Sequence, residues 1–120
     1  MSIHLTEQRA SNILVLRLSG KLARMDYLRF APEFERHLRD HGKVRVLLEM
    51  IDFHGWETGG LWEDLKADLH HFTHLERIAL VGDQRWERAM SLFCQPYTRA
   101  RVRYFDRKDI NRARAWLEEE

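Results

Sequence analysis

Hydrophobic and polar residues repeat at two different spacings along the chain, and each spacing predicts a type of element. Ile3–Gln8 and Ile13–Leu18 are rich in aliphatic residues, and turn-prone residues lie between them. These two segments predict an antiparallel hairpin. From Asp26 onward, apolar residues recur at the spacing of one helix face, and Gly42 is suited to end that helix. The chain therefore begins with two strands and a helix.

The remaining sequence alternates further strands with helices. Three short runs of β-branched and aliphatic residues are expected to form strands: Val44–Met50, Arg77–Val81 and Arg101–Phe105. Each run precedes a helical pattern, and the expected first residues of these helices are Thr58, Asp83 and Asp106. The order ββαβαβαβα predicts an α/β fold, and a length of 120 residues suits a single domain over residues 1–120.

The sheet is expected to be mostly parallel and in sequential strand order, with an antiparallel N-terminal edge strand, because crossover helices join parallel neighbours. One face of its strands is apolar, whereas the other carries Arg45, Glu49 and Arg103. Burial of these charges without partners would be unfavourable, so helices are expected mainly on the apolar face. Apolar residues at the centre of the charged face make that face a possible homodimer surface: Val15, Leu47, Ala79 and Val81.

Several segments carry a resemblance to a known family: Asp52-Phe53, Thr58-Gly59-Gly60-Leu61, Arg77–Asp83 with Trp86, Tyr104-Phe105-Asp106 and Ala113–Leu117. With the order of elements, they resemble the SpoIIAA-like family, which is related to STAS domains of anti-sigma-factor antagonists. The similarity spans nearly the whole chain and is greatest to an uncharacterised bacterial branch. It implies a STAS-like fold and a non-enzymatic regulatory or protein-interaction role.

The same resemblance bears on phosphorylation. In the regulators of this family, an Asp-Ser-Ser-Gly-Leu motif carries a serine that a partner kinase phosphorylates. Matching Gly60-Leu61 to the end of that motif puts Gly59 at the phosphorylated serine. Thr58 then takes the place of the preceding serine, and Glu57 takes that of the aspartate. Because Gly59 has no hydroxyl group, we expect the serine phosphoswitch to be absent.

An aromatic segment after the strand Val44–Met50 is the strongest candidate for a binding surface. Four rings lie within ten residues around a glycine-containing loop, and the carboxyl ends of parallel strands are common binding sites. The competing interpretation is that the loop folds back onto the core. The candidate residues for binding a partner or ligand are Phe53, His54, Trp56, Thr58, Gly59 and Trp62.

Other reactive residues form less complete patterns. His70 and His74 have a spacing that lets two imidazoles bind one metal, but no third ligand is evident. Cys94 lies near the carboxyl end of its expected helix, where the dipole disfavours a thiolate. We therefore expect no catalytic residue, metal or cofactor. Perturbed titratable groups around His54 and Glu57 would instead point to an enzyme.

Composition narrows the class of partner. Twenty basic and nineteen acidic residues leave a net charge of +1, which gives no indication of nucleic-acid binding. Apolar runs are far shorter than the ~20 residues of a membrane-spanning helix, so no stable membrane insertion is expected. A single cysteine and an N-terminus without a signal pattern indicate a cytoplasmic protein. The alternative to an interaction module is a carrier for a small apolar molecule or lipid, because the fold also resembles lipid-transfer domains.

Overall fold

The computed structural model of this chain describes residues 2–7, 13–41, 43–56, 63, 67, 75–83, 85 and 100–119. It contains five strands: β1 (Ser2–Glu7), β2 (Ile13–Leu22), β3 (Val44–Trp56), β4 (Leu75–Gly82) and β5 (Arg101–Asp106). The helices are α1 (Arg24–His41), the short 3-10 helix η2 (Arg107–Asp109) and α4 (Ile110–Glu118). The helices expected from Thr58 and Asp83 lie largely outside the described residues.

All five strands form one sheet in the order β1-β2-β3-β4-β5. β1 is antiparallel to β2, and the other three neighbouring pairs are parallel. The predicted α/β class, sequential order and antiparallel edge strand are therefore confirmed. Two strands are longer than expected, because β2 continues to Leu22 and β3 continues to Trp56.

α1 packs on the face that the sequence pattern marks as apolar. Phe34 and Leu38 of α1 share a buried cluster with Leu14, Leu16 and Val46 of the sheet. Alternate residues of a strand point to the same face, so the even-numbered positions of β2 and β3 meet this helix. Among the described residues, no helix is long and apolar enough to cross a bilayer.

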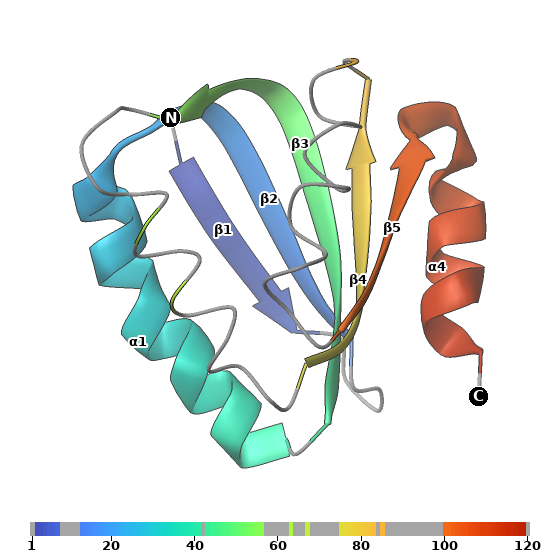
Figure 1. The fold of residues 1–120 in the computed structure, drawn as a ribbon, viewed down its shortest axis with the longest axis horizontal. Helices are drawn as coiled ribbons and strands as arrows, with labels where there is room; N and C mark the ends of the chain where they lie inside the picture. Colours follow the sequence, from blue (N-terminus) through green and yellow to red (C-terminus); the bar gives the residue numbers. More distant parts are fainter. Residues whose placement is uncertain are drawn as a thin grey trace.

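α4 packs on the opposite face, so the expectation that helices lie mainly on one face is wrong for this helix. Ala113 and Leu117 are buried against the odd-numbered residues of the central strands, and Figure 1 shows the sheet between α1 and α4. The right-handed crossover rule applies to helices that join two parallel strands. α4 follows the last described strand, so that rule does not decide its face.

Two arginines of this face, Arg45 and Arg77, bind α4 instead of keeping the face bare. Arg45 donates from Nη1 to the carbonyl oxygen of Leu117 at 2.6 Å and also to that of Glu119. Arg77 donates to the carbonyl oxygen of Trp116 at 2.5 Å. These carbonyl groups lie at the carboxyl end of α4, where most carbonyl groups lack an intrahelical donor and the helix dipole is negative; that of Trp116 also accepts from the backbone N–H of Glu119. The two arginines therefore fix the carboxyl end of α4.

Because α4 covers this face, the predicted homodimer surface is wrong. Leu47 and Ala79 are each 0% exposed in the single chain, and Val15 and Val81 are also buried. Glu49 is partnered too, since its carboxylate lies 3.4 Å from Arg17 and 3.7 Å from Arg114. Burial of this mixed face thus leaves its apolar centre packed and the charges of Arg45, Glu49 and Arg77 partnered.

Candidate functional site

The end of β3 projects beyond its neighbour β4. Register pairs between these strands run from Val44 opposite Leu75 to Glu49 opposite Val81. On its other side β3 continues to pair with β2, as far as Leu22 opposite Trp56. In Figure 1 this last part of β3 bends away from β4 across the ends of β1 and β2. The expected binding segment therefore begins as strand rather than as loop.

Two bulges shape this projecting end. Between successive register pairs, β3 uses three residues where β2 uses two, so each step adds one residue to β3. The backbone has positive φ at Asp52 (49°) in the first bulge and at Gly55 (87°) in the second. Left-handed backbone at the bulged residue defines one class of bulge, and the extra residue bends the strand. The bend turns the end of β3 out of the regular sheet.

The first bulge turns Phe53 into the core. Its side chain is 4% exposed and shares a cluster with Leu22, Tyr27 and Met50. Without the extra residue, Phe53 and Met50 would point to opposite faces of the sheet, because strand side chains alternate. Phe53 therefore anchors the segment, and it does not offer a surface contact.

The other predicted site residues fall into two groups. His54 is exposed, one position beyond the anchor. The backbone of Trp56 pairs with Leu22, but its side chain lies outside the described structure, as do Thr58, Gly59 and Trp62. For these four residues, a binding role stays a prediction.

Sequence reasoning missed Ile51 and Arg107. Ile51 is 38% exposed, beside the exposed Asp52 and close to His54; alternation from the buried Met50 is the signal that would have found it. Arg107 donates to the carbonyl oxygen of Met50, and its guanidinium lies 3.3 Å from the carboxylate of Asp83. Arg107, the residue after β5, therefore connects the middle of β3 at Met50 with Asp83, the residue after β4.

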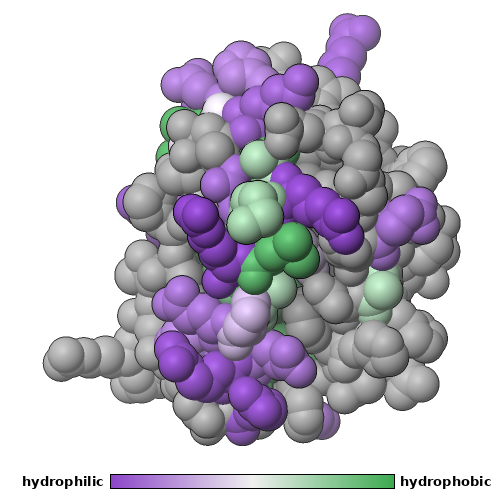
Figure 2. Space-filling view, turned by 90° about the vertical axis from the view of Figure 1, so that its left-hand side faces the viewer, coloured by the Kyte–Doolittle hydropathy of each residue, from purple (hydrophilic) through white to green (hydrophobic). Residues whose placement is uncertain are grey.

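A second exposed apolar area lies on α1. Figure 2 shows the side of the molecule that carries this helix, with a narrow apolar band among hydrophilic residues. The large apolar residues of α1 that are exposed are Met25 (57%) and Leu28 (43%). They lie near the start of α1, which directly follows β2.

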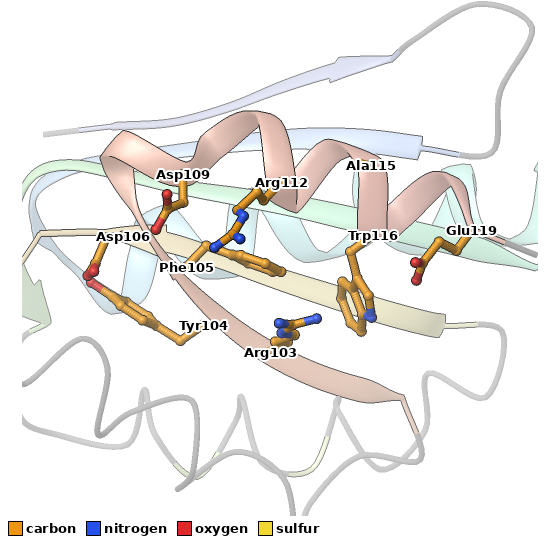
Figure 3. Close-up of a pocket in the computed structure, with 9 residues that line it drawn as sticks. All are labelled: Arg103, Tyr104, Phe105, Asp106, Asp109, Arg112, Ala115, Trp116 and Glu119. Atoms are coloured by element: carbon orange, nitrogen blue, oxygen red, sulfur yellow. The ribbon is translucent and has the colours of Figure 1, made fainter.

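A cleft of about 420 Å³ opens between β5 and α4. Phe105 and Trp116 form its aromatic part, with ring centroids 6.0 Å apart. The guanidinium of Arg103 lies 4.8 Å from the centroid of the Phe105 ring. Figure 3 shows the residues that line the cleft: Arg103, Tyr104, Phe105, Asp106, Asp109, Arg112, Ala115, Trp116 and Glu119. Five of these side chains carry charge, so the cleft suits a polar partner.

Comparison with known proteins gives one family and two similar folds. Residues 13–118 match the SpoIIAA-like family. An uncharacterised protein with a SpoIIAA-like fold from Shewanella loihica PV-4 aligns with a TM-score of 0.75 and 24% identity, over 97% of this chain and 92% of that one. The Bacillus cell fate determinant SpoIIAA in its phosphorylated form aligns with a TM-score of 0.56 and 15% identity, over 92% and 98%. No curated protein gives a significant match.

Proposed function

Because the chain belongs to the SpoIIAA-like family, we propose that it is a non-enzymatic, cytoplasmic module that regulates or binds another protein. The projecting end of β3 is the observation that carries this proposal. It presents Ile51, Asp52 and His54 to solvent on a strand that the buried Phe53 holds in place. A rigid support reduces the entropy lost when a partner binds. The docking surface comprises this end and the residues that follow it, with Trp56, Thr58, Gly59 and Trp62.

The local geometry supports a specific docking surface. The two bulges and the Phe53 anchor determine the direction in which Ile51 and His54 point. Arg107 reinforces the first bulge, because it donates a hydrogen bond to the carbonyl group of Met50. A surface that keeps its shape when free favours rigid recognition of a partner.

The docking surface is tested with matched apolar-to-acidic substitutions. Ile51→Asp and Leu28→Asp each replace an aliphatic side chain of similar exposure, 38% and 43%, but only Ile51 belongs to the proposed surface. Protein purified with its bound partners from its native host is compared by mass spectrometry with the two variants and with His54→Ala. We expect a partner that is retained by Leu28→Asp and lost or reduced by Ile51→Asp and His54→Ala. Equal retention by all three variants would contradict the proposal.

We also propose that the module works without serine phosphorylation at the position of the family motif. Gly59 occupies that position and has no acceptor oxygen. Intact-mass measurement of protein from its native host is expected to show no phosphate. Stoichiometric phosphate on the neighbouring Thr58 would show that the switch has moved by one residue.

The alternative function, a carrier for a small apolar molecule, gains no support from the cleft beside β5. Arginine and carboxylate side chains make up much of its lining, whereas apolar ligands bind in sites lined mainly by hydrophobic residues. Native mass spectrometry of the purified protein separates the two functions. A lipid-sized adduct that is lost on denaturation would favour the carrier.

A further inference from the structure

β5 forms one edge of the described sheet. Its inner side pairs with β4 in six consecutive register positions, from Arg77 opposite Arg101 to Gly82 opposite Asp106. No described strand pairs with its outer side. An edge strand presents backbone N–H and C=O groups with the spacing that another extended chain requires.

The side chains of β5 differ in character between its two faces. Arg101, Arg103 and Phe105 point to the face that carries α4, since they pair in register with Arg77, Ala79 and Val81. Val102 and Tyr104 point to the other face and are half-buried. A strand added to this edge would therefore meet two arginines and a phenylalanine on one face and mainly apolar residues on the other.

Three arginines of β5 and α4 are available for a partner. Arg101, Arg103 and Arg112 are exposed, and none of them forms an ion pair with any described residue. Arg103 instead stacks on Phe105, and in Figure 3 Arg112 extends from α4 toward the same ring. Guanidinium groups form strong bidentate contacts with carboxylates. The cleft also carries the carboxylates of Asp106, Asp109 and Glu119, so the cationic side chains that an added strand meets directly are those of Arg101 and Arg103 on β5.

We propose that the outer edge of β5 binds an extended acidic segment of a partner protein by strand addition. Two acidic side chains at alternate positions meet Arg101 and Arg103, and an apolar side chain two residues further meets Phe105. The intervening side chains are apolar and meet Val102 and Tyr104. This edge is separate from the end of β3, so either surface can fail its test without the other.

A second copy of this chain is a poor occupant of the same edge in the registers that bring the arginines of β5 together. Antiparallel pairing of two β5 strands about a twofold axis keeps each face on the same side of the sheet. If the pairing is centred on Arg103, the two Arg103 residues lie directly opposite each other. If it is centred on Val102, Arg101 of each copy lies opposite Arg103 of the other. Like charges in these positions are destabilising.

The proposal is tested by selecting octapeptides from a random library displayed on phage, with the full-length protein as target. We expect the selected peptides to contain two acidic residues at alternate positions with an apolar residue between them. Arg103→Glu is expected to weaken binding of a selected synthetic peptide about tenfold or more. Arg29→Glu, at an exposed position of α1, is the charge-matched control and is expected to leave the affinity unchanged.

Strand addition is distinguished from simple charge attraction by peptide backbone methylation. A selected peptide N-methylated on alternate amides keeps its carboxylates but loses half of its backbone donors. In one of the two methylation registers, we expect binding to be lost, because the outward-facing amides pair with β5. Full binding by both methylated peptides would overturn the proposal. The proposal would also be overturned if no peptide were selected, or if Arg103→Glu bound the peptide as tightly as the wild type. A wild-type dimer that excludes the peptide would overturn it as well.

Discussion

Phe53 and His54 are adjacent in β3, but their side chains have opposite surroundings. Phe53 is packed among Leu22, Tyr27 and Met50, whereas His54 is exposed. We expect Phe53→Ala to lower the free energy of unfolding by about 3–5 kcal/mol, because it leaves a cavity. His54→Ala is expected to change it by less than about 0.5 kcal/mol. Urea unfolding of both variants measures the difference.

The outcome of this comparison assigns the two residues to separate roles. A large loss of stability in Phe53→Ala, with full stability in His54→Ala, leaves His54 free to act in binding. Equal loss of stability in both variants would mean that His54 also supports the fold. His54→Ala would then not report on binding alone, and Ile51→Asp would be the variant that tests the docking surface.

Glu76 and Arg45 make stability depend on pH. The Nε atom of Arg45 donates to the Glu76 carboxylate at 2.7 Å, and this hydrogen bond lowers the pKa of Glu76 below 4.5. Desolvation by burial acts in the opposite direction but is outweighed. Because the pKa is lower in the folded state than in the unfolded state, the contribution is complete above about pH 4.5. It is lost as the pH falls through the folded-state pKa.

Glu76→Gln is expected to remove this pH-dependent contribution. At pH 7 the variant should unfold at a lower urea concentration than the wild type, and the difference should shrink as the pH falls to about 3. Glu33→Gln, at an exposed position of α1, is the control for removal of one carboxylate. A wild-type advantage that grows on acidification would mean that the pKa of Glu76 is raised, rather than lowered, by folding.

At the scale of the element, the first bulge of β3 depends on the left-handed backbone at Asp52. Its φ of 49° is unfavourable for most residues and especially for β-branched ones. We expect Asp52→Val to lower the free energy of unfolding by about 1–3 kcal/mol. Asp52→Gly should change it by less than about 1 kcal/mol, because relief of the backbone strain offsets the greater freedom of the unfolded chain. Urea unfolding compares the variants. Equal stability of Asp52→Val and Asp52→Gly would contradict the dependence of the bulge on left-handed backbone at residue 52.

The bulges also show where local sequence stops being informative. Ser19-Gly20 and the segment from Asp52 favour turns, and the pattern predicted that β2 and β3 end before them. In the structure the same residues lie within extended strands. Residues that tolerate positive φ occur in both turns and bulges. Here the pairing of Gly20 with Phe53 shows that these residues form a bulge and not a turn.

The strand order was predictable for a general reason, and the face of α4 was not. Sequential order follows from hydrophobic runs that alternate with helical patterns and from the rule for crossovers. The position of α4 instead depends on Arg45, which meets Leu117 across 72 residues of sequence. A charged residue in a strand pattern indicates solvent exposure unless its distant partner is known. The end of β3 stands out in the sequence through its aromatic residues, whereas the β5 cleft has no local motif that predicts it.

At the scale of the whole molecule, α4 covers a face of the sheet that would otherwise promote association. Val15, Leu47, Ala79 and Val81 form an apolar centre on this face, and Leu117 of α4 packs against it with 1% of its surface exposed. Arg45 and Arg77 hold the end of the same helix. Contiguous apolar area on a sheet promotes association when it is uncovered. α4 therefore serves both stability and solubility.

Leu117→Asp and Ala115→Asp test this role on one helix. The first substitution would place a carboxylate against the apolar centre, where it has no partner, and would force α4 off the sheet. We expect this variant to lose stability and to show a larger mass than the wild type by light scattering at high micromolar concentration. Ala115 is exposed on the same helix, so Ala115→Asp should keep the wild-type mass and stability. If Leu117→Asp kept both as well, the apolar centre of the sheet would not depend on α4 for cover.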